Sequence, residues 1–217
     1  MRKPQLMSDP TPARQLMIDS QLRARGISDP HVLEAMLRVP RHEFVPAPYQ
    51  GQAYEDHPLP IGDGQTISQP YIVARMLESL QLTPTDKVLE VGTGSGYVTA
   101  LLAQLAAQVF SIERHPALAE RARNVLADLG YANVRVLTGD GTLGLPAKAP
   151  FDAILVSAAA PDLPPALLSQ LSDSGRMIIP VGSPGSQQLQ FIRMQNGQPA
   201  ISLRELVLFV PLVHDRD

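Results

Sequence analysis

The fold of this chain is decided by the stretch Lys87-Val88-Leu89-Glu90-Val91-Gly92-Thr93-Gly94-Ser95-Gly96-Tyr97-Val98-Thr99-Ala100. It opens as a short apolar run, passes through three glycines at alternate positions, and continues as an apolar segment that suits a helix. A strand, a glycine loop and a helix in this order can bind a nucleotide-like ligand at the helix N-terminus. The stretch therefore predicts a ligand-binding α/β domain.

From Lys87 onward, strand-like and helix-like segments alternate along the chain. Strands are expected at residues 87–91, 109–113, 134–137, 152–156 and 176–181, with helices between them at 98–105, 116–129 and 163–171. Such alternation predicts an α/β fold with a doubly wound, mostly parallel sheet. Two further strand-like runs, 189–194 and 201–211, flank Asn196-Gly197, and Asn-Gly is a hairpin turn sequence. The sheet should therefore end in a C-terminal antiparallel hairpin.

The first third of the chain predicts helices and an irregular connection. Residues 1–12 are polar, hold three prolines, and should form a flexible tail. N-terminal helices are expected from residue 13 to a stop at Gly26, from an N-cap at Asp29 to just before Pro40, and after Pro70. Residues 41–64 carry four prolines and three glycines and should be irregular, and a connection of this length is often functional. We expect a single domain over residues 13–217, with an N-terminal helical region (13–86), a cofactor-binding core (87–182) and C-terminal strands (183–217).

Composition narrows the class of protein and its partners. The 217 residues are 44% hydrophobic and 18% charged, which is typical of a globular protein. The net charge of -3 offers no basic excess for a nucleic-acid backbone, and the five histidines show no metal-ligand spacing. No apolar run approaches the ~20 residues of a membrane helix, and the absence of Cys suits a reducing compartment. We expect a cytoplasmic monomer without a metal, nucleic-acid or membrane partner.

The glycine-rich loop is the first candidate for cofactor binding. It consists of Gly92, Thr93, Gly94, Ser95 and Gly96. The helix after it offers unpaired N–H groups and the positive end of its dipole, which suit the carboxylate of S-adenosylmethionine (SAM). Glu90 lies two residues before the first glycine and is predicted to bind the cofactor together with the loop. A G-x-G-x-G loop with this upstream acid, about ninety residues into the chain, favours SAM over NAD, whose fingerprint is G-x-G-x-x-G near the start of its domain.

Two acids at the ends of later strands complete the expected cofactor site. Glu113 ends the second strand, and an acid about 20 residues after the glycines can accept hydrogen bonds from the ribose hydroxyls of either cofactor. The alternative for Glu113 is capping of the loop that follows. Asp140 stands between Gly139 and Gly141 after the third strand and could accept a hydrogen bond from an adenine amino group. Because Asp and Gly both favour turns, an ordinary turn stays open as the alternative there.

The stretch Thr66-Ile67-Ser68-Gln69 is the candidate for binding the methyl acceptor. Ser68 lies two residues before Pro70, which suits a helix N-cap, and the pattern alone favours this role. Alternatively, the hydroxyl of Ser68 lines the acceptor pocket. The small residues 158–160 follow the fourth strand at the same expected edge of the sheet and leave room for a substrate.

Beyond these motifs, the chain closely resembles the protein-L-isoaspartate O-methyltransferase family from about residue 13 onward. The Thr-Ile-Ser-Gln-Pro sequence within Gly64–Tyr71 is specific to this family, whereas many methyltransferases share the glycine loop. Ser157 is a mild departure, since many relatives have Thr there. The other matching blocks are residues 39–41, 44–46, 59–62, 88–97, 139–141, 149–154, 158–161, 180–182 and 209–213.

The resemblance implies an enzyme that repairs damaged proteins and peptides. The family transfers the methyl group of SAM to the free α-carboxylate of L-isoaspartyl residues and of some D-aspartyl residues. The ester then closes to a succinimide, whose hydrolysis returns part of it to aspartate. By the family pattern, Ser68 is the active-site residue. The neighbouring acceptor residues are Thr66, Ile67 and Gln69, and the cofactor residues are Glu113, Asp140 and Gly141.

This reaction requires mainly that the acceptor oxygen, the methyl carbon and the sulfur of SAM are held in line. A carboxylate is ionised at neutral pH, so no strong general base is required. We therefore expect Ser68 to orient the acceptor rather than to act as a covalent nucleophile. Two alternatives stay open: an O-methyltransferase for another carboxylate or small molecule, and a SAM-binding protein without catalysis.

Overall fold

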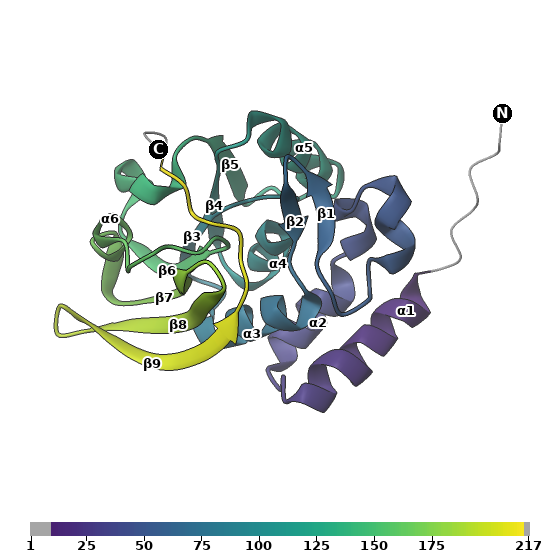
Figure 1. The fold of residues 1–217 in the computed structure, drawn as a ribbon, viewed down its shortest axis with the longest axis horizontal. Coiled ribbons are helices and arrows are strands. Elements are labelled where there is room, and N and C mark those ends of the chain that lie inside the picture. Colours follow the sequence, from purple (N-terminus) through teal and green to yellow (C-terminus); the bar gives the residue numbers. More distant parts are fainter. Residues whose placement is uncertain (1–9, 215–217) are drawn as a thin grey trace.

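The computed structural model describes residues 10–214, apart from the side chains of residues 203 and 204 (Figure 1). Most of the tail predicted at residues 1–12 therefore lies outside the described residues. The last part of that segment is helical, because helix α1 (Thr11–Leu16) begins inside it. No helix within the described residues is both long enough and apolar enough to cross a membrane.

A seven-stranded sheet with the order β5-β4-β3-β6-β7-β8-β9 occupies the centre of the fold (Figure 1). Its strands are β3 (Lys87–Val91), β4 (Gln108–Glu113), β5 (Val134–Thr138), β6 (Phe151–Val156), β7 (Leu171–Ser183), β8 (Ser186–Gln195) and β9 (Gln198–Val207). The strands from β5 to β7 are parallel, and β8 and β9 are antiparallel to their neighbours. The predicted α/β class and the predicted C-terminal hairpin are confirmed. Because β3 lies between β4 and β6, the glycine loop opens where the chain switches sides of the sheet, which is where ligands bind in such folds.

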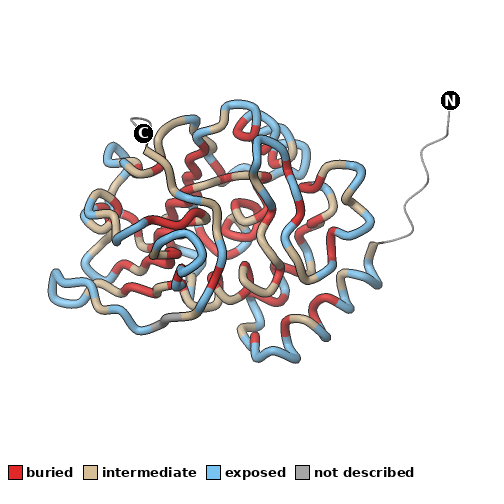
Figure 2. The backbone as a smooth tube through the Cα atoms, viewed as in Figure 1, coloured by how far each residue is buried: buried red, intermediate tan, exposed pale blue. Residues whose placement is uncertain are grey.

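The sheet side chains alternate between two apolar layers. Val88 belongs to the layer that contains α2 (Pro30–Arg38), α3 (Pro70–Leu80), α4 (Tyr97–Leu105) and α5 (Pro116–Asp128). Leu89 belongs to the opposite layer, which also contains Leu167 of α6 (Pro165–Leu168) and, on either side of the short turn η6 (Pro146–Lys148), Leu145 and Ala149. The helix predicted at 163–171 is only about one turn long, because Leu171 already begins β7. Figure 2 shows the buried backbone concentrated in the sheet and in the helices packed on it.

The N-terminal helices begin and end where the sequence places their stop and cap residues. Helix α1 continues through a π-helical segment, η1 (Met17–Leu22), and a 3₁₀ turn, η2 (Arg23–Arg25). Gly26 ends this run with a φ of 91°, a left-handed conformation that glycine adopts without strain. Asp29 caps α2, since its carboxylate accepts a hydrogen bond from the His31 N–H at 2.8 Å. Both predictions are confirmed.

Residues 41–64, predicted to be irregular, instead contain ordered turns and the first strand of a hairpin, whose second strand follows directly. The elements are η3 (Arg41–Phe44), η4 (Ala47–Gln52), β1 (Leu59–Gly62) and β2 (Gln65–Ile67). Asp63 and Gly64 form the turn with φ values of 51° and 69°, and Asp-Gly is a turn sequence that the prediction overlooked. The hairpin brings the predicted acceptor residues against the glycine loop: the Arg121 side chain of α5 donates a hydrogen bond to the Ile61 carbonyl and holds the hairpin there.

The C-terminal segment leaves the sheet earlier than predicted. The Asn196-Gly197 turn between β8 and β9 is confirmed, but β9 ends at Val207 and does not continue to residue 211. The side chain of Gln187 accepts a hydrogen bond from the Phe209 N–H and donates one to its carbonyl, so the chain turns away from the strand. Residues 210–212 then bond to Ala159 at the end of β6. In Figure 1 this yellow segment crosses in front of the sheet.

Candidate active site

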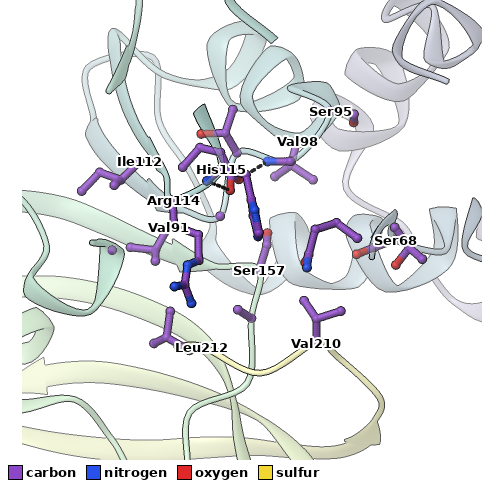
Figure 3. A pocket seen from close by; sticks show the side chains of 18 of the residues that line it. Ser68, Val91, Ser95, Val98, Ile112, Arg114, His115, Ser157, Val210 and Leu212 are labelled. Carbon is purple, nitrogen blue, oxygen red and sulfur yellow. Dashed lines mark hydrogen bonds between the residues drawn. The ribbon is translucent and has the colours of Figure 1, made fainter. Parts of the chain in front are cut away.

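A pocket of about 370 Å³ opens at the carboxyl ends of β3, β4 and β6 (Figure 3). Its walls come from the glycine loop, the β1–β2 hairpin, residues 112–115, residues 157–158 and the crossing segment 210–213. Figure 3 shows Ser68 at one end of the pocket and Val91 and Ile112 at the other, with Val210 and Leu212 along one wall. Its volume falls within the range of about 300–1,000 Å³ that is usual for small-molecule sites.

The glycine loop has the backbone that the sequence predicted. Gly92, Gly94 and Gly96 have φ values of 90°, 53° and 89°, and Gly96 is the N-cap residue of α4. A Cβ on Gly94 would lie 3.3 Å from Ile61 Cδ1, so the hairpin packs closely over the loop. Gly96 supports the loop from outside the pocket. The loop residues that line the pocket are Gly92, Thr93, Gly94 and Ser95.

Glu113 takes the loop-capping role that the sequence left open, and it also lies at the pocket. The side chain lines the pocket and is almost fully buried. One carboxylate oxygen accepts a hydrogen bond from the Gly94 N–H at 2.8 Å, and the other accepts one from the His115 N–H at 2.9 Å. These bonds connect the glycine loop to the end of β4. Each carboxylate oxygen has a further lone pair that can accept a bond from a ligand hydroxyl.

Glu90 is not in the pocket, contrary to its prediction as a cofactor-binding residue. Its side chain is fully buried beneath the glycine loop, where one oxygen accepts hydrogen bonds from the hydroxyls of Thr99 at 2.5 Å and Ser111 at 2.7 Å. Ser111 in turn shares a hydrogen bond with the Thr93 hydroxyl. Burial raises the pKa of Glu90 to about 8, and the two hydroxyl donors offset only part of this shift. Glu90 therefore acts on the loop from below, through Ser111 and Thr93.

Asp140 takes the turn role, and Gly141 forms the pocket wall. The Asp140 carboxylate accepts hydrogen bonds from the N–H and the hydroxyl of Thr142, and its other oxygen lies 3.6 Å from Nδ1 of His214. Its side chain is not among the groups that line the pocket, whereas Gly141 lines it. A Cβ on Gly141 would lie 2.5 Å from Cγ1 of Val91, so only glycine allows this turn to pack against the end of β3.

The acceptor residues lie where the pocket meets a second cavity. Thr66, Ile67 and Ser68 line the pocket, and Gln69 lines only the second cavity. The interpretation of Ser68 as a helix cap is wrong: the N-cap position of α3 is Gln69, and the Asp56 carboxylate accepts a hydrogen bond from the Tyr71 N–H in the first turn. The side chain of Gln69 instead donates hydrogen bonds to Asp56. The Ser68 hydroxyl is thus placed at the junction of the two cavities.

The second cavity is a larger groove of about 710 Å³ beside α3 and the end of β9. It shares Thr66, Ser68, Ser157 and Val210 with the first pocket, so the two spaces are continuous. None of the described residues that line it is charged. At its rim, Leu206 and Leu208 are 78% and 80% exposed. An uncharged groove that adjoins the first pocket suits a chain-like substrate.

Several pocket residues were not predicted as site residues. Arg114 and His115 follow Glu113 directly, so their position at the end of a strand was a local signal. Residues 210–213 gave no signal of their own beyond the family block that contains them, because a strand was expected there. His42 and His57 form local hydrogen bonds: their Nδ1 atoms bond to the Tyr54 hydroxyl and the Pro58 carbonyl. Within residues 10–214 no cluster of side chains could hold a metal ion.

The donors and acceptors of the pocket fit SAM. The Glu113 carboxylate can accept hydrogen bonds from ribose hydroxyls, and the apolar Val91, Ile112 and Leu212 can enclose an adenine ring. The close approach of Ile61 to Gly94 and of Val91 to Gly141 forms a cradle that larger side chains would fill. The fold and this pocket define a Rossmann-like, SAM-dependent methyltransferase.

Comparison with known proteins gives the family. A model of the protein-L-isoaspartate(D-aspartate) O-methyltransferase family (PCMT) matches residues 13–217. The protein-L-isoaspartate O-methyltransferase of Koribacter versatilis is 61% identical over 200 residues, which cover 92% of this chain and 90% of that protein. Protein-L-isoaspartate O-methyltransferase 1 of Syntrophobacter fumaroxidans is 54% identical over 203 residues, covering 93% and 94%. This chain belongs to the protein-L-isoaspartate(D-aspartate) O-methyltransferase family.

A solved structure supports the fold and the cofactor. A crystal structure under the PCMT name from Plasmodium falciparum, in complex with S-adenosyl-L-homocysteine, superposes with a TM-score of 0.79 at 28% identity and covers 92% of this chain and 98% of that one. The family is SAM-dependent, so the predicted enzyme class and cofactor are confirmed. An O-methyltransferase for another small acceptor is not favoured.

Proposed function

We propose that this chain methylates the free α-carboxylate of L-isoaspartyl and some D-aspartyl residues in damaged proteins and peptides, as a cytoplasmic monomer. The observation that carries the proposal is the junction of two cavities at Ser68. The inner pocket has the groups for SAM, and the outer groove is open and uncharged along its lining. An isoaspartyl residue can enter the junction while its flanking residues stay in the groove. Relatives that cover nearly the whole chain carry the same enzyme name.

The cofactor side of the proposed site is built by the core of the chain. The loop residues Gly92, Thr93, Gly94 and Ser95 shape the pocket for the methionine part, and Glu113 accepts from the ribose. Gly141 forms the wall beside the adenine. Glu90 and Asp140 support this side through Ser111 and through the turn at Thr142, without contact to the cofactor. When bound, SAM supplies an electrophilic methyl group on a sulfonium.

The acceptor side is built by the β2 end of the hairpin. The acceptor carboxylate is ionised at neutral pH and needs no base. The Ser68 hydroxyl donates a hydrogen bond to one carboxylate oxygen and leaves the other free to attack, while Thr66 and Ile67 shape the wall around it. Holding the acceptor in a near-attack position is the main contribution that the protein makes. In this division, residues 13–86 provide the acceptor side, 87–182 the cofactor side, and 183–214 cover both.

The proposal is tested with two peptides that differ only in one linkage. One peptide contains an isoaspartyl residue, and its twin contains normal aspartate at the same position. With radiolabelled SAM, base-labile methyl ester should form on the isoaspartyl peptide at least about a hundredfold faster than on its twin. Equal rates on both peptides would point to another acceptor. S-adenosyl-L-homocysteine binding by calorimetry without any turnover would support a binding protein without catalysis.

The oligomeric state of the protein and its location in the cell need separate measurements. The net charge of -3 and the absence of Cys agree with a cytoplasmic protein that does not bind nucleic acid. Light scattering across a concentration series should give the mass of one chain, 23.5 kDa, and twice this mass would contradict a monomer. Cell fractionation should find the methyltransferase activity in the cytoplasm, and activity in the membrane fraction would contradict the proposed location.

A further inference from the structure

Arg41 is a fully buried cation between the two sides of the proposed site. It begins η3 and is 0% exposed. Among the ion pairs of the part of the chain that the structure describes, none includes Arg41. Burial lowers the pKa of Arg41 to about 10, so the guanidinium still carries its charge at neutral pH. A buried charge without a carboxylate partner is costly in free energy, and its contacts must compensate for the lost hydration.

The contacts of Arg41 reach both sides of the site. Its Nη2 donates a hydrogen bond to the main-chain carbonyl of Ser68 at 2.8 Å, and its Nε donates one to the Ala53 carbonyl at 2.7 Å. Its guanidinium carbon lies 4.8 Å from the ring centroid of Tyr97. Tyr97 is the first residue of α4, directly after the glycine loop, and lines the cofactor pocket. One side chain therefore contacts the acceptor residue Ser68 and the helix that starts at the loop.

We propose that Arg41 is a positioning residue that fixes the backbone of Ser68 relative to the glycine loop and so sets the distance between acceptor and methyl donor. The inference rests on the proposed function, since it assumes that Ser68 orients the acceptor. Arg41 touches neither ligand in this arrangement and acts through Ser68 and Tyr97. Displacements of about 1 Å in such an arrangement can lower the rate about a hundredfold.

The geometry requires arginine rather than another cation. The guanidinium is planar and carries donors that point in fixed directions, so it can bond two carbonyls while its flat face meets an aromatic ring. A lysine ammonium is a single point of charge on a flexible stem. In Arg41→Lys the charge and the contact with Tyr97 can remain, but the bonds to Ser68 and Ala53 cannot both be kept. This substitution therefore isolates the positioning of Ser68 from the burial of a charge.

The test compares Arg41→Lys in two backgrounds, with Ser68 present and with Ser68→Ala. In the first background kcat for an isoaspartyl peptide should fall about tenfold, while the peptide KM and the Kd of S-adenosyl-L-homocysteine by calorimetry stay within about twofold. In the Ser68→Ala background Arg41→Lys should lower kcat no further, because both substitutions remove the same alignment. Thermal unfolding of each variant shows that the fold is kept. Arg38→Met, at an exposed arginine of the neighbouring helix, is the control and should keep full activity.

The outcomes separate this inference from the proposed function. An equal loss of kcat from Arg41→Lys in both backgrounds would overturn the inference and leave the role of Ser68 intact. A loss expressed mainly in the Kd of S-adenosyl-L-homocysteine would likewise overturn it, since Arg41 would then act on the cofactor side. An unchanged kcat in Ser68→Ala alone would remove the proposed role of Ser68, and the inference with it. Arg41→Met, which also removes the charge, should lower both kcat and the unfolding temperature.

Discussion

Glu90 is a buried carboxyl group whose effect on stability should depend strongly on pH. It is fully buried under the glycine loop and accepts hydrogen bonds only from the hydroxyls of Thr99 and Ser111 among the described residues. Burial raises the pKa of Glu90 from 4.5 to about 8. The folded protein therefore keeps a proton on Glu90 at pH values where the unfolded chain has released it.

The sign and size of the effect follow from this difference in pKa. The stability that the raised pKa contributes is fully present below pH 4.5, declines as the pH rises, and is lost once the pH passes about 8. The decline is at most ~1.4 kcal/mol per pH unit. Glu90→Gln keeps the shape and the hydrogen-bond acceptor but has no proton to lose. Relative to this variant, the parent protein should lose about 2 to 3 kcal/mol of unfolding free energy between about pH 5.5 and about pH 7.5.

The measurement is urea unfolding followed by circular dichroism, because the chain has no Trp. Stabilities of the parent and of Glu90→Gln are compared at several pH values, so that titration of the histidines, common to both proteins, cancels. Glu34→Gln removes an exposed carboxylate and should give a curve parallel to that of the parent. Parallel curves for Glu90→Gln and the parent would refute the reasoning, since Glu90 would then titrate alike in the folded and unfolded chains.

Three further variants test the site. Ser68→Ala should lower kcat on an isoaspartyl peptide about tenfold, which is the effect of one lost hydrogen bond. Calorimetry should find the cofactor affinity within about twofold of that of the parent. An equal loss of kcat and of cofactor affinity would contradict an acceptor role for Ser68. Gly141→Ala places a methyl group 2.5 Å from Val91 Cγ1 and should lower the free energy of unfolding in urea by about 1–3 kcal/mol. It should also weaken the binding of S-adenosyl-L-homocysteine. Unchanged binding would exclude Gly141 as part of the cofactor pocket. Replacing the exposed Leu206 and Leu208 by Asp should raise the peptide KM several-fold (about threefold or more) at unchanged stability, and an unchanged KM would exclude the groove as the peptide site.

The sequence by itself determined the elements whose signals are local. Val88, Leu89 and Val91 are apolar because β3 is buried on both faces, and β3 has the predicted bounds. Asp29, Gly26 and the Asn196-Gly197 turn took their predicted roles because each depends on the conformation of only a few neighbouring residues. The family followed from the sequence as well, since each of its matching blocks is a short continuous stretch of residues.

Only the tertiary structure decided which of the predicted residues reach the pocket. Glu90 and Glu113 both lie on strands that end at the ligand edge, but the side chain of Glu90 points into the core below the loop and that of Glu113 lines the pocket. Their directions depend on strand register and on which helix covers each face, which spacing along the chain does not specify.

The same holds for the parts of the site that come from distant segments. The crossing of residues 210–213 depends on hydrogen bonds between Gln187 and Phe209 and on pairing with Ala159, contacts that span more than twenty residues of sequence. The bond from Arg41 to Ser68 likewise joins residues 27 positions apart. Such contacts form only when the sheet has brought their elements together, so local sequence patterns do not predict them.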